Sequence, residues 1–260
     1  MRRFIDSWTS WAALLVGIGA VIAAFTTTST RLGYNLTVAF AAFVVFFAAL
    51  SLLARKRTNG SWGLVTIGLA MAMVPFLVAN FQPDPGAAWT GAVAGLLAMV
   101  LGAIGWMTGQ PPTVTGISHW GSPDAPREKL ETWLNRGGLV IGLVVVLLAV
   151  ILPGASPAAV LVTAGLGVFL MVASVWAWLA ADATRDYFMV ATVGFALFLA
   201  PTAAGYGHEA AAWAAWIPGA IATALGVTGY LRGDARDLTA DLKESAVERY
   251  HRTYREAPAG

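Results

Sequence analysis

The sequence contains no cysteine and few charged residues. Of its 260 residues, 12% are charged and 58% are hydrophobic. The lack of cysteine excludes disulfides, thiolate metal sites and thiol catalysis, although it says nothing about the redox compartment. The low charge excludes a soluble globular protein, because such chains carry about 25% charged residues.

Charged residues and histidine are also missing from eight long apolar runs. Each run has about the 20 residues that an α-helix needs to cross the roughly 30 Å hydrocarbon core of a bilayer. The sequence therefore predicts an all-α integral membrane protein with eight transmembrane helices. The runs cover approximately residues 8–25, 35–54, 62–80, 89–107, 137–153, 157–180, 187–204 and 213–231.

Lysine and arginine are unevenly distributed between the two sides of this topology. Fifteen of the 16 fall on the side of both chain termini, and only Arg31 falls on the other side. Because cytoplasmic loops are enriched in Lys and Arg, both termini are expected in the cytoplasm. An alternative is that Arg2, Arg3 and the first apolar run form a signal peptide. The spacing of that run matches the third run, which favours a transmembrane helix.

The fourth and eighth runs share one spacing pattern, in which an aromatic residue is followed by three glycines at fixed intervals and a second aromatic. Its members are Trp89, Gly95, Gly102, Gly105 and Trp106, and then Trp213, Gly219, Gly226, Gly229 and Tyr230. Weaker copies begin at Ala41 and Gly167. The first, third and seventh runs also share a glycine six residues after an aromatic residue. We therefore expect four helical-hairpin repeats arranged in two pseudo-symmetric four-helix halves.

Proline and glycine punctuate the sequence between the fourth and fifth runs, as is typical of a linker. The end of this linker places Leu130, Trp133 and Leu134 on one helical face, which predicts a short helix at the cytoplasmic interface. The predicted domains are a first membrane half at 1–107, the cytoplasmic linker at 108–135, a second membrane half at 136–232 and a cytoplasmic tail at 233–260. Apolar residues four apart predict an amphipathic helix in the tail.

Glycines form a nearly bare face on the fourth and eighth runs. Small residues allow helix backbones to approach closely in a membrane, where lipid supplies no hydrophobic drive between helices. We expect these glycines to pack within the chain; the alternatives are a dimer face or a groove for a lipid chain. The predicted helix-packing residues are Gly91, Gly95, Gly102, Gly105, Gly219, Gly226 and Gly229.

Two prolines and two carboxylates occupy corresponding places on the side opposite the termini. Pro75 and Pro201 each remove one backbone hydrogen bond, so we expect helix kinks there. Paired broken helices in two repeats also point to transport sites, which makes a pocket between the halves the alternative. Asp84 and Glu209 follow the prolines in nearly equivalent loops. They are expected to be solvated loop charges, or else a weak outer-face site for a cation or a partner.

The third run and the helix after it resemble the SPW-repeat membrane proteins of bacteria and archaea. The resemblance rests on Trp62, Gly68 and the pair Pro75-Phe76, followed by a Trp-initiated glycine-rich helix. The Ser-Pro-Trp tripeptide itself is absent, since Val74 and Phe76 flank Pro75. It implies a prokaryotic plasma (inner) membrane protein built of hairpin repeats and brings no established activity with it.

The sequence contains no catalytic, cofactor-binding or metal-binding motif that we recognise. The favoured hypothesis is a non-enzymatic membrane protein that acts by packing and interaction, with membrane lipids around it and a cytoplasmic protein partner bound through residues 234–260. It involves no nucleic acid, and a homo-oligomer is left open. The alternative is a carrier or binding protein for a lipid or small neutral solute between the two halves. A membrane enzyme ranks third, because no ionisable pair stands at the membrane boundary.

Overall fold

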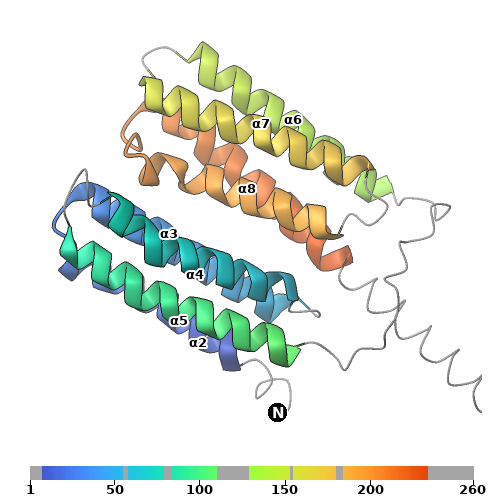
Figure 1. The fold of residues 1–260 in the computed structure, drawn as a ribbon. Coiled ribbons are helices and arrows are strands. Elements are labelled where there is room, and N and C mark those ends of the chain that lie inside the picture. The colour runs from blue at the N-terminus through green and yellow to red at the C-terminus, as the bar shows by residue number, and fades with distance from the viewer. Residues whose placement is uncertain are drawn as a thin grey trace, which may run out of the picture.

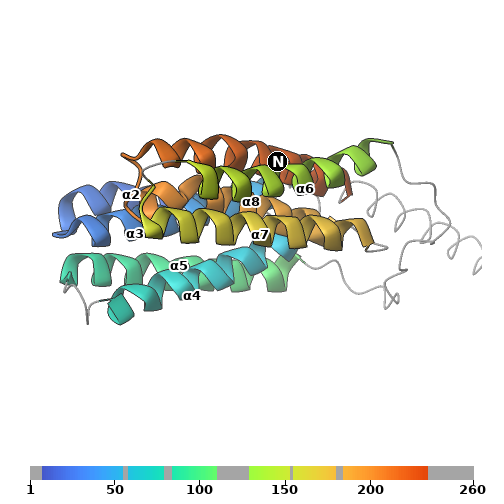
Figure 2. The same cartoon turned by 90° about the horizontal axis from the view of Figure 1, so that it is seen from above.

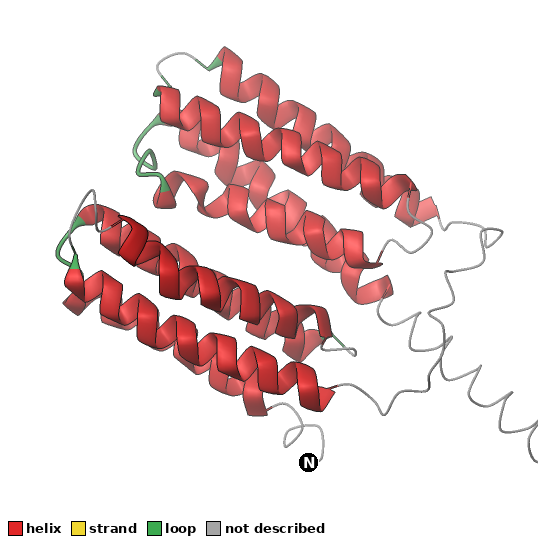
Figure 3. Ribbon diagram, in the orientation of Figure 1, coloured by secondary structure: helices red, strands yellow, loops and turns green. Residues whose placement is uncertain are grey.

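The structure, a computed structural model, describes residues 8–54, 58–78, 84–109, 129–152, 155–179 and 184–233. These residues form eight α-helices and one short 3-10 helix, with no strand among them (Figure 3). The all-α prediction is therefore confirmed. The amphipathic helix expected in the tail lies outside the described residues. The helices are α2 (Trp8–Thr27), α3 (Arg31–Leu53), α4 (Thr58–Val78), α5 (Pro85–Gly109), α6 (Lys129–Ile151), α7 (Pro157–Leu179), α8 (Thr184–Ala203), η1 (Ala210–Ala212) and the last helix, 213–233.

Six of these helices are long and apolar enough to cross a membrane. They are α2, α3, α5, α7, α8 and the last helix. In the described parts of α4 and α6 the apolar stretches are shorter, Asn59–Val74 and Arg136–Ile151. The chain is thus a helical bundle with six membrane-span-like helices.

The helices form two groups of four, which we call the first half (α2 to α5) and the second half (α6 to the last helix) (Figure 1). Figure 2 shows that the helices of both halves run along one common direction. The connections near residues 28–30, 84, 155–156 and 204–212 lie together at one end of the bundle, which we call the hairpin end.

One detail differs from the expected domain boundaries. The separate interfacial helix expected at the end of the linker is not formed, because residues 129–135 are the first turns of α6. No proline interrupts the chain between Lys129 and Ile151, and Gly137 and Gly138 can continue a helix even though they weaken it. The linker thus passes directly into the fifth of the eight helices.

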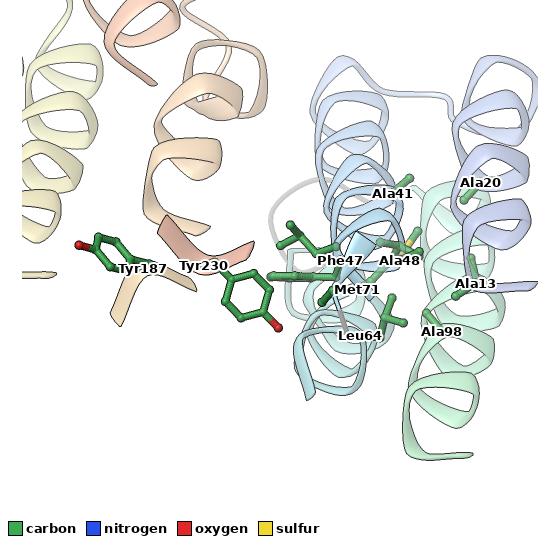
Figure 4. Close-up of a cluster of buried hydrophobic side chains, with 14 of the residues drawn as sticks. Ala13, Ala20, Ala41, Phe47, Ala48, Leu64, Met71, Ala98, Tyr187 and Tyr230 are labelled. Carbon is green, nitrogen blue, oxygen red and sulfur yellow. The ribbon is translucent and has the colours of Figure 1, made fainter. Parts of the chain in front are cut away.

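The inside of the first half is rich in small side chains, beside larger ones such as Phe47, Leu64 and Met71, and many of the largest apolar side chains lie on its surface. Ala13, Ala41, Ala48 and Ala98 are completely buried, whereas many of the largest apolar side chains are exposed. This distribution is the reverse of a water-soluble bundle. The central cluster also contains Tyr187 and Tyr230 of the second half, and Figure 4 shows Tyr230 beside Phe47.

Candidate functional site

In each helical hairpin the two helices approach each other closely at a glycine. In the second hairpin, a methyl carbon placed on Gly68 would lie 2.6 Å from both the carbonyl oxygen of Gly95 and the amide nitrogen of Met99. In the fourth hairpin, one placed on Gly194 would lie 2.5 Å from the amide nitrogen of Thr223, four residues after Gly219. Side chains cannot be accommodated at such distances, so glycine is what allows these helices to touch through their backbones.

The other two hairpins cross at the corresponding positions. A methyl carbon on Gly142 would lie 2.8 Å from the carbonyl oxygen of Gly167, and one on Gly17 would lie 3.1 Å from that of Ala41. Seven of the eight residues at these crossings belong to the spacings that repeat in the sequence, and Gly142 of the fifth run does not. Hairpin one is the loosest, because Ala41 stands where the other three have glycine.

The helix-packing glycines predicted from the sequence are all buried. Gly102 and Gly105 of α5 pack against Ser61 of α4, and Gly105 also faces Thr9 of α2. In the last helix, Gly226 packs against the backbone of Ala191, and Gly229 packs against the ring of Tyr187. These contacts lie within the chain. Gly95 and Gly219 are at the crossings described above, and Gly91 lies one turn before Gly95.

The predicted outer-face residue Asp84 is turned inward at the hairpin end. Its side chain is only 5% exposed. One carboxylate oxygen accepts hydrogen bonds from the backbone N–H groups of Ser29 and Thr30, at 3.0 and 2.8 Å, and from the Thr30 hydroxyl at 2.9 Å. The other accepts one from the backbone N–H of Ala87 at 3.0 Å. We call this arrangement the Asp84 latch, because it joins the α2–α3 connection to the start of α5.

Local sequence explains how the latch forms. Asp84 precedes Pro85, the first residue of α5, and its bond to Ala87 is the side-chain cap that a helix N-terminus requires. Thr30 caps α3 in the same way, accepting a hydrogen bond from the backbone N–H of Gly33 at 2.9 Å. A methyl carbon on Gly33 would collide with the Asp84 carboxylate. Glycine at this position therefore makes the room for the latch.

The electrostatics of the Asp84 latch favour the charged carboxylate. Burial raises the pKa of Asp84, but the hydrogen bonds from Ala87, Thr30 and Ser29 together outweigh it, and the pKa is lowered from its ordinary value of 3.8. Hydrogen bonds donated to a carboxylate stabilise its ionised form. The latch is consequently anionic at neutral pH.

Glu209 forms a second, more exposed latch in the other half. Its carboxylate accepts hydrogen bonds from the backbone N–H of Ser156, at 3.0 Å, and from the Ser156 hydroxyl, and these bonds lower the pKa of Glu209. Ser156 is the cap of α7, since its hydroxyl accepts a hydrogen bond from the backbone N–H of Ala159 at 3.3 Å. We call this the Glu209 latch.

The two latches have the same topology. In each half, a carboxylate from the second hairpin holds the capping hydroxyl residue of the first hairpin, Thr30 or Ser156. They differ in depth, since Asp84 is buried and Glu209 is partly exposed. Three residues after the cap, α3 has Gly33 and α7 has the completely buried Ala159. Neither carboxylate reaches into the other half, so the structure does not bring Asp84 and Glu209 together as one site.

The two predicted kink positions lie inside helices. Pro75 is within the bounds of α4, and Pro201 is within α8 and is fully buried. The helix continues past Pro201, since the backbone N–H of Ala204 donates to the carbonyl oxygen of Ala200 at 2.8 Å. Proline therefore does not end α8 at this position. The expected kinks stay predictions.

Aromatic rings fill the contact between the two halves. Phe195 of α8 stacks on Phe46 of α3 at a centroid distance of 4.4 Å and meets Phe43 edge-on at 5.0 Å. Nearer the opposite end, Phe188 stacks on Phe47 at 5.5 Å. We call this contact between α3 and α8 the aromatic seam.

Comparisons with protein-family models, with curated proteins and with solved structures find no match for this chain.

Sequence reasoning identified the two carboxylates but missed their partners. A signal was present at Ser156, a hydroxyl residue directly before an apolar run and followed by a proline, as is typical of a helix start. At Thr30 the signal was weaker, because the apolar run begins only at residue 35. The aromatic seam was also missed. Clustered phenylalanines in a transmembrane helix look alike whether they face lipid or another helix.

Proposed function

We propose that this chain is an integral membrane protein of eight transmembrane helices that acts by packing and interaction and catalyses no reaction. Both termini are proposed to face the cytoplasm of a prokaryotic cell, with the hairpin end outside. The single observation that carries the membrane assignment is the combination of a small-residue interior with an exposed apolar surface. Such a surface is stable only where lipid or another apolar partner covers it.

The length of the helices supports eight spans over six. The α4 and α6 helices have 21 and 23 residues, and each is paired by a glycine crossing with a helix long enough to cross a membrane. A helix that packs along the side of a membrane-spanning helix must lie at the same depth in the membrane as that helix. Exposed Trp62 and Trp133, near the starts of these helices, fit the aromatic belt at a membrane interface.

The hairpin crossings and the two latches support the proposed repeat. All four crossings join the corresponding residues of each hairpin, and the two latches join corresponding connections of each half. Each half has an even number of helices, so both halves enter the membrane from the same side. A pseudo-symmetry axis along the membrane normal is then expected, as in parallel repeats. Membership of the SPW-repeat family, which would explain such hairpins, stays a proposal.

The aromatic seam favours interaction over transport. A carrier for a lipid or a neutral solute between the halves needs an interior path, and along α3 and α8 the stacked rings of Phe46, Phe47, Phe188 and Phe195 occupy that place. The described carboxylates at the hairpin end, Asp84 and Glu209, are each engaged within their own half. Uptake of lipid or solute by vesicles containing the purified protein would support the carrier hypothesis against this proposal.

A pull-down in mild detergent tests the proposed interaction. We expect the full chain to retain a specific cytoplasmic protein that a chain lacking residues 234–260 does not retain. A variant with the same residues of the tail in scrambled order is the matched control, because it keeps the charge and loses the amphipathic pattern. Equal recovery by all three forms would overturn the assignment of the partner to the tail.

A further inference from the structure

The aromatic seam joins unlike faces of the two halves, with α3 of one against α8 of the other. If the halves are equivalent, as the proposed function holds, the counterpart of the α3 face lies on α7 and the counterpart of the α8 face lies on α4. The crossing residues set the register, since Ala41 and Gly167 lie 126 residues apart in the sequence, as do Gly68 and Gly194. In that register Phe43 corresponds to Phe169, Phe46 to Val172, and Phe195 to Leu69.

These counterpart faces are not covered by the described parts of the chain. Phe169 is 54% exposed, Val172 53% and Leu69 47%, whereas Phe43, Phe46 and Phe195 are all partly buried. The contrast is larger at one end of the face. Leu50 of α3 is 2% exposed, while its counterpart on α7, Trp176, is 66% exposed. The contact between α3 and α8 is therefore formed within the chain, whereas the counterpart faces on α7 and α4 are both present but do not contact each other.

The uncovered face of α7 also has the surface shape that suits packing against another helix. Gly165 lies on it next to Leu161 and Phe169, and a methyl carbon placed on Gly165 would touch nothing. Its counterpart on α3 is Ala39, which is 7% exposed. A bare glycine between large side chains makes a notch that a neighbouring helix can enter. The α4 face offers Leu69 and Met73 as the projecting side chains.

We propose that a second copy of this chain docks its α4 face on the α7 face, in the way that α8 packs on α3. The α4 face consists of Trp62, Leu69 and Met73; the α7 face consists of Leu161, Gly165, Phe169, Val172 and Trp176. In an eight-helix topology α4 and α7 run in opposite directions, as α3 and α8 do. Two copies inserted the same way can therefore form this contact. Because its two sides differ, the contact either closes a ring or continues to further copies.

Cross-linking in the membrane tests the docking directly, since the chain has no native cysteine. Leu69→Cys and Phe169→Cys are placed in separate copies with different tags, co-expressed, and treated with a flexible bismaleimide. We expect a product that carries both tags. The control replaces Leu69→Cys by Leu15→Cys, which is at least as exposed but lies on α2. We expect the control product to be several-fold weaker.

A second pair separates failure of the docking from failure of the aromatic seam that serves as its template. Phe43→Cys with Phe195→Cys in one chain should link within that chain, because their rings are in contact. If this pair links while the Leu69→Cys and Phe169→Cys pair only equals its control, lipid covers the two faces and the docking is overturned. If neither pair links, the seam that serves as the template is overturned with it.

Substituting Gly165, the glycine of the notch, tests the contact in another way. We expect Gly165→Leu to lower the product between copies several-fold and to leave the link between positions 43 and 195 unchanged. Gly19→Leu, also at a glycine with nothing around it, should change neither. An undiminished product between copies in the Gly165→Leu protein would overturn the notch as part of the contact.

Discussion

Gly68 and Gly95 approach each other across α4 and α5 so closely that neither has room for a side chain. A methyl carbon on Gly68 would lie 2.6 Å from the carbonyl oxygen of Gly95, and one on Gly95 would lie 2.5 Å from that of Gly68. The relation is reciprocal between Gly142 and Gly167 as well. Backbone contact of this kind requires small residues on both helices. This requirement explains why most residues of the repeated spacing are glycines.

Substituting other glycines of the same two hairpins tests whether close packing of α4 on α5, and of α8 on the last helix, stabilises the fold. We expect Gly102→Leu and Gly226→Leu to lower the melting temperature and the recovery of folded protein, because Gly102 faces the backbone of Ser61 and Gly226 that of Ala191. Overpacking a tight core costs about 1–3 kcal/mol. The measurement is thermal unfolding of the purified variants in detergent.

Gly19→Leu is the matched control, since it makes the same change where nothing lies within 4 Å. Equal melting temperatures of the Gly19→Leu and Gly102→Leu proteins would contradict the packing of α5 on α4. A smaller oligomer with unchanged melting would assign these glycines to a subunit contact.

Removing the Asp84 carboxylate should open the hairpin end of the first half. Asp84→Ala leaves the backbone N–H groups of Ser29, Thr30 and Ala87 without their acceptor, and an unsatisfied buried group costs about 1–3 kcal/mol. We expect a lower unfolding free energy and faster hydrogen exchange at residues 28–30. Asp84→Asn should be intermediate, because it keeps an oxygen acceptor and loses the charge.

Glu209→Ala is the comparison in the second half. Its effect should be smaller, because Glu209 holds only Ser156 and is partly exposed. Faster exchange should then appear at residues 155–156 and not at 28–30. If exchange at 28–30 rose equally in both variants, the latches would not act separately in their own halves.

The pKa of Asp84 predicts loss of stability in acid. Because this pKa is lower in the folded protein than its ordinary value of 3.8, the carboxylate stabilises the fold fully above that value. The contribution is lost as the pH falls through the lower, folded pKa. We therefore expect the melting temperature of the unmodified protein to fall more steeply in acid than that of Asp84→Asn. Parallel curves for the two proteins would show that another group governs the acid transition.

Reporter fusions test the eight-span topology. Fusions at Thr58 and Pro126 should report the cytoplasm, and fusions at Asp84 and Gly207 should report the outside, because Lys and Arg are concentrated on the side of the termini. The side of the membrane changes with every span, so the pattern is sensitive to a missing span. A single reversed fusion would contradict the eight-span topology.

The composition of the sequence was sufficient to predict the helices. Long apolar runs without a charge satisfy their backbone hydrogen bonds only as helices in a membrane, and this local requirement places helix ends within a few residues. The spacing of Gly68, Gly95, Gly194 and Gly219 also indicated where helices could approach. The start of α6 was predicted too late in the chain. Charged residues near Lys129 come before the apolar run and limit the predicted span, but they do not break a helix.

Only the tertiary structure decided which partner each residue meets. Asp84 and Thr30 are 54 residues apart, and nothing in their own segments requires a contact. Their hydrogen bond depends on how far the start of α5 is shifted and turned relative to α3, which the packing of one hairpin against the other sets. The same holds for Phe46 and Phe195, whose apolar rings would suit lipid equally well. A helix is determined by its own composition, whereas a contact between helices depends on the positions of both, and that information belongs to the packed molecule.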